Sequence, residues 1–250
     1  MEKIVAIIPA RWGSSRFPGK PLAPIAGKPM IQWVVERTRL ATKLADVFVA
    51  TDDERIVEVV ESFGGKAVMT PSDLPSGTDR VAYVARDLEI DAVINVQGDE
   101  PLIDPNAVDV LADTLLTETS TKMATLVRKI TESEELANAN TVRVVIDNNH
   151  NALYFSRAAI PFARDIDKKE WALHFPYYDH IGIYAYRKDF LLELTELPIS
   201  VLEQAESLEQ LRVLENGYNI KVGIVDVQPI CVDVPKDVER VEQRIKELKI

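Results

Sequence analysis

The sequence contains a single cysteine, Cys231, so no disulfide can form within the chain, which is compatible with a reducing cytoplasm. It contains no apolar run of transmembrane length, and no signal peptide precedes the first predicted strand. Internal repeats and low-complexity linkers are also missing. We therefore expect a cytoplasmic protein with neither a membrane span nor a disulfide framework.

Positive charge is scarce as well. The chain has 29 basic residues against 40 acidic ones, and its net charge of −11 argues against nucleic acid or an anionic membrane as a partner. The three histidines lack the spacing of a metal site, and Ser14 and Ser15 have no evident histidine partner for nucleophilic catalysis. A length of 250 residues, of which 46% are hydrophobic, suffices for one substantial core and an inserted subdomain.

One long loop lacks acidic residues but is rich in basic ones. A buried strand is predicted over residues 4–8, and the loop that follows it contains Arg11, Arg16, Lys20 and Lys28 without a single carboxylate. Cations at the carboxyl end of a first strand predict a site for a polyanion, most simply a nucleoside triphosphate. The alternative is a solvated basic loop, although long ordered loops in compact domains are usually functional.

This loop is not a P-loop. Five residues separate Gly13 from Gly19, whereas that motif has four, and Pro21 stands where it has Ser or Thr after the lysine Lys20. Gly13 and Ser14 allow the backbone to approach a ligand closely, but the prolines of the loop remove amide donors. Side-chain cations are therefore expected to carry much of the anion binding.

The remaining sequence alternates strands with helices, which predicts an α/β fold with a Rossmann-like, mostly parallel sheet flanked by helices. Strands are expected at 47–51, 67–69, 92–96, 122–127, 141–146, 152–155, 181–186 and 221–227. Helices are expected at 30–41, from a cap at 52 or 53 to 60, from a cap at 78 or 79 to 88, from 105, at 132–139, at 202–215 and after 233–237.

Aromatic residues gather from about residue 151 onward. We interpret residues 150–200 as an inserted mixed or antiparallel unit that covers one side of the cleft. The aromatic patch is either a subunit interface, which we favour, or local core.

Ligands of such sheets bind beyond the carboxyl ends of the strands, so segments 70–78 and 97–101 should meet the basic loop at one cleft. Asp99, with Gly98 before it to allow a tight turn, is placed to hold a phosphate-bound Mg²⁺, which takes one or two protein carboxylates. Alternatively, Asp99 caps the next turn. Asp233 is either a second metal carboxylate or the cap of the terminal helix, and the sequence favours neither.

Three further residues are ambiguous on chemistry alone. Arg80, in the predicted helix start 76–80, adds a cation near the cleft. Glu100 is expected to be structural or peripheral. His180 precedes a predicted strand, and an isolated histidine there is more often structural than catalytic.

Eight blocks, in order along nearly the whole chain, resemble 3-deoxy-manno-octulosonate cytidylyltransferases, also called CMP-KDO synthetases. These blocks are residues 8–11, 15–22, 50–53, 76–80, 95–101, 152–157, 180–184 and 208–212. The resemblance implies a cytosolic, usually dimeric enzyme that makes CMP-KDO and pyrophosphate from CTP and the eight-carbon acidic sugar KDO, for lipopolysaccharide. It implies one nucleotidyltransferase domain over residues 1–250, in which about 150–200 form the sugar side and the dimer contact.

Site residues follow from the resemblance by position. The resemblance assigns CTP binding to Pro9, Ala10, Arg11, Gly13, Ser14, Lys20, Ser76, Arg80, Gln97 and Asp99, and Mg²⁺ binding to Asp99 and Asp233. It assigns the sugar side to Arg157, His180, Tyr184, Glu209 and Gln210, and catalysis to Arg11, Lys20, Asp99 and Asp233. His180 thereby becomes an expected substrate contact.

The chain departs from the family pattern near its end, where Cys231 replaces a glycine and Val234 replaces a threonine. Phe17 and residues 161–162 resemble a sister group that activates 8-amino-KDO, whereas Glu100 resembles the KDO enzymes. The expected acceptor is KDO, and the alternatives are 8-amino-KDO or another acidic sugar such as a sialic acid. A nucleotide-binding module without catalysis is the alternative from another functional class.

Overall fold

The computed structural model describes residues 2–13, 17–138 and 140–250, and its chain contacts divide it into two compact units. The first unit consists of residues 1–112 together with 229–250, and the second of residues 113–228. The second unit is therefore inserted into the sequence of the first, and it contains all of the aromatic-rich segment 150–200. That the whole chain works as one nucleotidyltransferase domain stays a prediction.

The first unit is built on four parallel strands. β1 pairs with β4 on one side and with β6 on the other, and β4 pairs with β5. These strands are β1 (Ile4–Ala10), β4 (Asp46–Thr51), β5 (Ala67–Met69) and β6 (Ala92–Asn95). Residues 4–8 are at most 2% exposed, because helices cover both faces of a parallel sheet.

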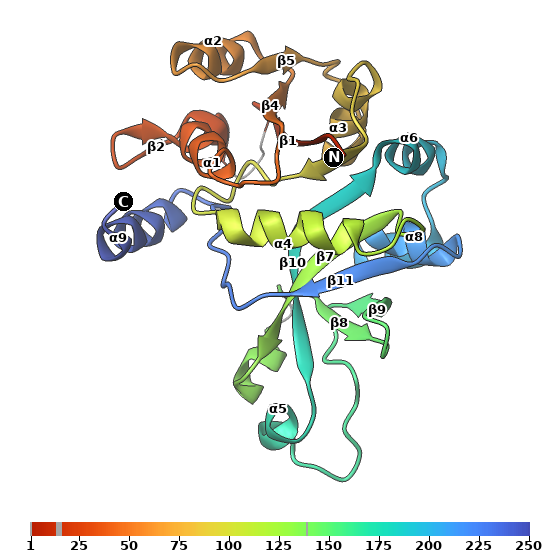
Figure 1. Ribbon diagram of the computed structural model, residues 1–250. Helices are drawn as coiled ribbons and strands as arrows, with labels where there is room; N and C mark the ends of the chain where they lie inside the picture. The colour runs from red at the N-terminus through yellow and green to blue at the C-terminus, as the bar shows by residue number, and fades with distance from the viewer. Residues whose placement is uncertain (1, 14–16, 139) are drawn as a thin grey trace. The chain divides into compact units, whose positions relative to one another are not determined.

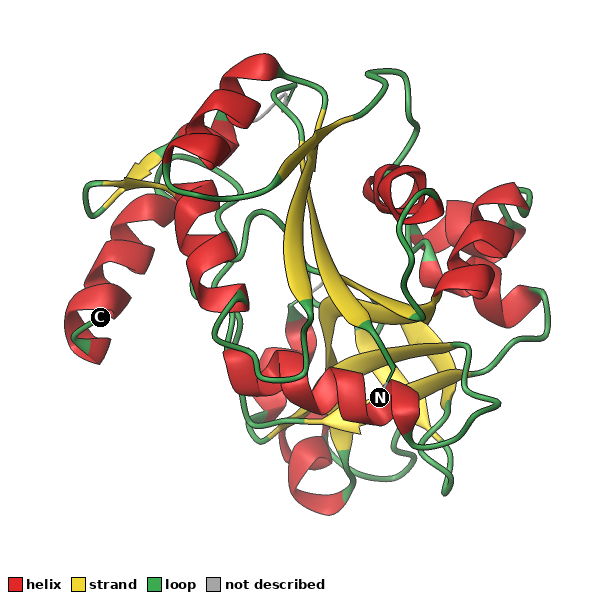
Figure 2. Cartoon of the chain, turned by 45° about the horizontal axis from the view of Figure 1, so that its top comes forward, coloured by secondary structure: helices red, strands yellow, loops and turns green. Residues whose placement is uncertain are grey.

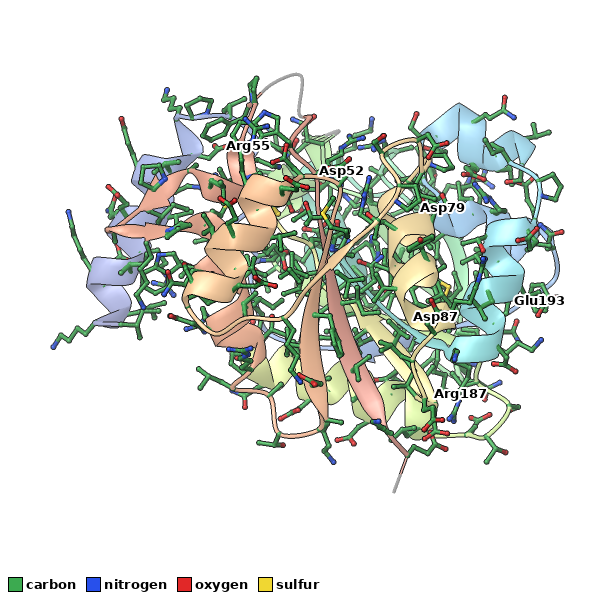
Figure 3. The ribbon with its side chains drawn as sticks, turned by 90° about the horizontal axis from the view of Figure 1, so that it is seen from above. Asp52, Arg55, Asp79, Asp87, Arg187 and Glu193 are labelled. Carbon is green, nitrogen blue, oxygen red and sulfur yellow. The ribbon has the colours of Figure 1, made fainter. Side chains whose placement is uncertain are left out.

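Three helices pack against these strands, namely α1 (Met30–Thr38), α2 (Glu54–Ser62) and α3 (Gly77–Arg86). In Figure 3, α2 begins near Arg55 on one side of the strands, and α3 runs between Asp79 and Asp87 on the other. Asp53 caps α2 by accepting a hydrogen bond from the backbone nitrogen of Arg55, as the sequence predicts. Ser76 caps α3, so the predicted caps at 78 and 79 were wrong by two or three residues.

The C-terminal helix α9 (Asp237–Leu248) lies beside the small hairpin of β2 (Pro24–Ile25) and β3 (Lys28–Pro29), as Figures 1 and 2 show. A one-turn helix, η1 (Lys20–Leu22), precedes the hairpin. An apolar cluster joins the two ends of this unit, because it combines residues near 30 with residues beyond 230. Its buried members are Ile25, Met30, Trp33, Val232, Val241 and Ile245. Leu248, predicted to face inward, is 43% exposed.

The second unit contains a mixed sheet. β7 (Met123–Ile130) pairs in parallel with β11 (Ile220–Ile224) and antiparallel with β10 (Tyr177–Arg187). β8 (Arg143–Ile146) and β9 (Ala152–Ser156) form an antiparallel pair, and β8 also pairs with β10. Together with the parallel strands of the first unit, this confirms the predicted α/β class with a mostly parallel sheet and an inserted antiparallel part.

Helices complete the second unit. The chain enters it through α4 (Pro105–Leu116), which starts at the predicted Pro105 and crosses the boundary at residue 113. The other elements are η2 (Ser133–Ala137), η3 (Lys168–Glu170), α5 (Trp171–His174), α6 (Lys188–Glu196), α7 (Val201–Glu206) and α8 (Gln210–Glu215). None of the helices in the described ranges combines the length and the hydropathy that a membrane crossing requires.

Two helix predictions in this unit were wrong. The helix expected at 132–139 is a short 3₁₀ turn, and the Arg143 guanidinium donates to the Glu135 carbonyl, which a continuing α-helix would use for its own hydrogen bond. The helix expected at 202–215 is broken in two at Ser207, whose φ of 53° is left-handed.

The aromatic residues divide between core and surface. Phe155, Trp171, Tyr177 and Tyr186 are at most 2% exposed. Phe162, in contrast, is 73% exposed.

Candidate functional site

One pocket of about 320 Å³ in the first unit gathers most of the predicted nucleotide residues. It is lined by Pro9, Ala10, Arg11, Lys20, Pro21, Leu74, Pro75, Ser76, Gly77, Arg80, Gln97, Gly98, Asp99 and Asp233. The basic loop, the segment after β5 and the end of β6 thus converge on one cleft, as the parallel topology predicts. Leu74, Pro75 and Pro21 were not predicted, since no chemistry marks them.

Two strand ends come very close together in this pocket. A Cβ atom on Gly98 would lie 2.7 Å from the Pro9 carbonyl oxygen, which no side chain can tolerate. Gly98 therefore allows the turn after β6 to press against the end of β1. This contact brings Asp99 and Arg11, from separate strands, to the same cavity.

Lys20 and Asp99 form an ion pair in the pocket wall. The Lys20 Nζ lies 2.8 Å from Asp99 Oδ2 and also donates to the Val232 carbonyl at 3.0 Å. Their side chains are 16% and 31% exposed. The Val232 amide in turn donates to the Asp99 carbonyl at 2.9 Å, which fixes the segment before Asp233 against the end of β6. Asp99 is therefore held as a charged acceptor rather than as a turn cap.

Glu100 lies behind Asp99 and is only 3% exposed. Burial, together with the negative charge of Asp99, raises the pKa of Glu100 to about 7. The Cys231 thiol lies 3.7 Å from Glu100 Oε1, while Oε2 has no partner within the described residues. Burial also raises the pKa of the Cys231 thiol. Glu100 is thus a buried acid beside the site.

Asp233 lines the pocket but does not cap the terminal helix. Lys236 occupies the N-cap position of α9, and Asp237 Oδ2 accepts hydrogen bonds from the backbone nitrogens of Asp233 and Val234 at 2.9 and 3.0 Å. These bonds, with the charge of nearby Arg240, lower the pKa of Asp237. Of the two roles that the sequence left open for Asp233, the cap is excluded.

Arg80 is a buried structural cation as well as a pocket residue. Its guanidinium is 4% exposed, donates from Nη2 to Asp52 Oδ2 at 3.0 Å and also bonds Thr70 Oγ1. Its charge is therefore already neutralised within the protein, and its ion pair joins α3 to Asp52, the residue after β4. We had expected an additional cation for the ligand. Ser76 and Gln97 line the pocket as predicted.

The remaining cations of the basic loop differ in whether they lie at the pocket. Arg11 is exposed at the pocket, whereas Lys28 pairs with Glu36 at 2.7 Å and stacks over Trp33, so it is not at the pocket. Arg16 and the predicted CTP ligand Ser14 lie outside the described residues. Gly13 is exposed and does not line the pocket.

Trp12, next to Arg11, is held by α2. The guanidinium of Arg55 stacks over the Trp12 ring at 3.4 Å from the centroid. Asp53 accepts from Arg55 Nε at 2.8 Å and from Nη2 at 2.6 Å, which fixes that guanidinium. The Trp12 carbonyl accepts from the Gly19 amide at 3.1 Å, so the loop is closed directly before Lys20. The sequence did not indicate this clamp.

The predicted sugar-side residues all lie in the second unit. β10 carries an irregularity between Ile181 and Tyr184, and Thr125 Oγ1 donates to the Ile183 carbonyl at 2.8 Å there. Since that hydroxyl hydrogen is used, the 2.9 Å contact with His180 Nε2 is one in which the imidazole donates. Desolvation lowers the pKa of His180 to about 3, so the ring is neutral.

Tyr184 and Gln210 are joined by a hydrogen bond of 3.2 Å from the phenol to Gln210 Oε1. Burial, and the charge of Glu209, raise the pKa of Tyr184. The His180 ring lies 5.4 Å from that of Tyr184. These predicted residues therefore form one cluster of neutral polar groups.

Arg157 follows β9 and is partly exposed. Its Nε donates to the Glu206 carbonyl at 3.0 Å. Glu206 is a residue that sequence reasoning missed.

The donor chemistry of the pocket fits a hard divalent cation that a phosphate helps to hold. Within the described ranges, no three Asp, Glu, His or Cys side chains gather closely enough to hold a metal alone. Asp99 and Asp233, however, both line the pocket, and Mg²⁺ takes one or two carboxylates and completes its shell with phosphate oxygens and water.

Comparison with known proteins gives concordant results. A family model described as cytidylyltransferase matches residues 5–222. The chain is 50% identical over 249 residues to a 3-deoxy-manno-octulosonate cytidylyltransferase of Bacteroides thetaiotaomicron, covering 98% of both chains. It is equally 50% identical over 246 residues to an 8-amino-3,8-dideoxy-manno-octulosonate cytidylyltransferase of Shewanella piezotolerans, covering 97% and 98%.

A solved structure of a CMP:2-keto-3-deoxy-manno-octonic acid synthetase complexed with CTP is 46% identical to this chain. It superimposes with a TM-score of 0.92 over 98% of this chain and 99% of that one.

Proposed function

Since this chain belongs to the cytidylyltransferase family, we propose that it transfers CMP from CTP to the anomeric hydroxyl of KDO, releasing pyrophosphate. The observation that carries the proposal is the pocket in which Arg11 and Lys20 meet the carboxylates Asp99 and Asp233. Cations suit a triphosphate, and paired carboxylates suit the metal that accompanies it.

In the proposed reaction, the anomeric oxygen attacks the α-phosphorus of CTP in line with the leaving group. An oxygen–phosphorus bond forms to the sugar, the bond from the α-phosphorus to the bridging oxygen breaks, and the hydroxyl proton is released to solvent. Arg11 and Lys20 neutralise the charge that builds on the departing pyrophosphate. No protein nucleophile takes part.

Asp99 and Asp233 would hold Mg²⁺. When bound, this ion polarises the α-phosphate and lowers the pKa of the attacking hydroxyl. Lys20 then exchanges its contact with Asp99 for the triphosphate, which carries more negative charge than one carboxylate. Ser76 and Gln97 present polar groups of the pocket to the cytosine.

We assign the acceptor to residues of the second unit. Arg157 would pair with the sugar carboxylate, because its planar fork matches a carboxylate with two parallel hydrogen bonds. His180, Tyr184, Glu209 and Gln210 would bind the sugar hydroxyls. The neutral ring of His180 suits this role, since a hydroxyl can donate to its unprotonated nitrogen.

The test is a pyrophosphate-release assay with CTP and Mg²⁺, in which KDO is compared with 8-amino-KDO. We expect release with KDO at a higher kcat/KM. A higher value for 8-amino-KDO would instead assign the chain to that acceptor, which the equal identity to both groups of relatives keeps as the second candidate. CTP binding without pyrophosphate release from any acidic sugar would identify a non-catalytic nucleotide-binding module.

We propose further that the enzyme is a cytoplasmic homodimer and that residues 150–200 contact the second copy. Large apolar side chains are exposed in this segment, namely Leu153 (59%), Phe162 (73%), Leu173 (76%) and Phe175 (45%). A concentration of large exposed apolar side chains in one segment favours a protein interface there. Light scattering should give twice the chain mass for the wild type and the chain mass for a Phe162→Glu/Leu173→Glu variant; a monomeric wild type would exclude the dimer.

A further inference from the structure

The end of β9 is held by one acidic residue. Glu206, the last residue of α7, accepts from Ser156 Oγ at 2.6 Å through Oε1 and from the backbone nitrogen of Arg157 at 3.0 Å through Oε2. Its carbonyl accepts from Arg157 Nε at 3.0 Å. Three hydrogen bonds therefore connect Glu206 with two consecutive residues.

The Glu206 carbonyl can accept from Arg157 because it has no hydrogen-bond partner within α7. The last carbonyls of a helix have no partner within the helix. Ser207 adopts the left-handed conformation, and its amide bonds the Glu203 carbonyl. The Glu206 carbonyl is thus left at the negative end of the helix, where a guanidinium is a favourable donor.

The hydrogen bond from Arg157 Nε to the Glu206 carbonyl leaves the guanidinium charge available to pair with an anionic ligand. Several other arginines are held by carboxylates, for example Arg80 by Asp52, and Arg212 by Glu203 through Nε and Nη2 at 2.7 and 2.6 Å. Arg157 is held by a carbonyl, and its Nη1 and Nη2 have no hydrogen-bond partner among the residues that the structure describes. It keeps a full positive charge and an open fork.

We propose that Glu206 is a positioning residue for the acceptor. It acts through Arg157, because it fixes both the backbone and the Nε of that residue and so aims the terminal nitrogens at the sugar carboxylate. The inference rests on the proposed function. Its physical basis is preorganisation: a guanidinium already held in its binding direction loses less conformational freedom when the carboxylate binds.

The first experiment is a kinetic comparison of Glu206→Gln with the wild type. The neutral amide offers one oxygen in place of two, so it cannot accept from both Ser156 Oγ and the backbone nitrogen of Arg157 as the carboxylate does. We expect the KM for the acceptor to rise about tenfold, while kcat and the KM for CTP stay within about twofold. Glu215→Gln is the matched control, because Glu215 accepts from the backbone nitrogen of Leu202 on the same helix pair and does not contact Arg157. Its constants should equal those of the wild type.

A second measurement separates positioning from general stability. Calorimetry should compare the binding of the acceptor acid with that of its methyl ester, which lacks the charge that Arg157 receives. In the wild type the ester should bind at least tenfold more weakly than the acid, and in Glu206→Gln this ratio should fall towards one. Ser156→Ala, which removes a donor to Glu206 and not to Arg157, should give an intermediate ratio.

An unchanged ratio of acid to ester binding in Glu206→Gln would overturn the inference, as would equal losses for CTP and acceptor. If the wild type releases no pyrophosphate but still binds the acid in a Glu206-dependent way, the proposed reaction fails and the positioning role stands.

Discussion

Lys20 and Asp99, separated by 79 positions in the sequence, form an ion pair of 2.8 Å in the pocket wall. The cation assigned to the triphosphate thus pairs with the carboxylate assigned to the metal. The pairing fixes the positions of both side chains in the wall of the pocket.

Replacement of Asp99 tests the metal role. Asp99→Asn keeps the shape of the side chain but removes its charge, so we expect turnover to fall at least about 100-fold while thermal unfolding changes little. Pyrophosphate release and circular dichroism are the measurements. Asp73→Asn, at an exposed loop carboxylate, is the control. Near-normal activity of Asp99→Asn would rule out the metal role.

Gly98→Ala tests the close contact of the two strand ends. The added Cβ would lie 2.7 Å from the Pro9 carbonyl oxygen, so backbone must move. We expect a loss of about 1–3 kcal/mol in the free energy of unfolding and a higher KM for CTP. Gly182→Ala, where nothing lies within 4 Å of the new Cβ, should be nearly neutral. Denaturant titration of both variants measures their free energies of unfolding. Equal values for Gly98→Ala and Gly182→Ala would refute the close contact.

The clamp on Trp12 should affect nucleotide binding. Arg55→Ala removes the guanidinium that stacks on the indole, and we expect a two- to fivefold higher KM for CTP with little change in the acceptor KM, since an exposed cation–π contact contributes about 0.5–1 kcal/mol. In a Trp12→Leu background the same replacement should have no effect. Arg164→Ala, at a side chain that is 88% exposed, is the surface control. Additive effects of Arg55→Ala and Trp12→Leu would contradict the coupling.

His180 should make stability depend on pH. The unfolded chain protonates this residue below its ordinary pKa of 6.5, whereas the folded chain does so only near pH 3. The contribution is therefore complete above pH 6.5 and is lost as the pH falls from 6.5 to about 3. Between pH 7 and 5.5 it amounts to about 1 kcal/mol of unfolding free energy. Urea titrations of the wild type and His180→Gln should show a smaller loss for the variant; parallel pH dependences would exclude the buried neutral ring.

Much of this architecture follows from local sequence. The apolar runs of β1, β4, β5 and β6 and the cap at Asp53 are signalled by composition alone. The break at Ser207 is not, because serine has no local preference for the left-handed conformation that it adopts there. The 3₁₀ turn at 133–137 is likewise not signalled, because the guanidinium that bonds its Glu135 carbonyl comes from Arg143, outside the segment.

The residues of the site also fall into two groups, those that the local sequence marks and those that it does not. The pocket positions of Arg11, Lys20 and Asp99 were predictable because residue type and strand ends mark them, whereas Gln97 was assigned only by the family resemblance. Arg80 lines the pocket as predicted, but its ion pair was not predictable, since its buried partner Asp52 lies 28 positions away and no spacing rule connects the two. Glu206 and Arg55 were missed because each acts on a neighbour and carries no motif of its own.

Because residues 113–228 are inserted between the two segments of the first unit, the ribosome makes those segments at different times. Residues 1–112 leave the ribosome first. Val232, which completes the cluster with Ile25, Met30 and Trp33, and Asp233, which completes the pocket, follow roughly 6–24 s later at ordinary elongation rates. A nascent or prematurely terminated chain therefore exposes apolar surface that chaperones can recognise and lacks the second carboxylate. Only a finished chain has the complete set of pocket residues.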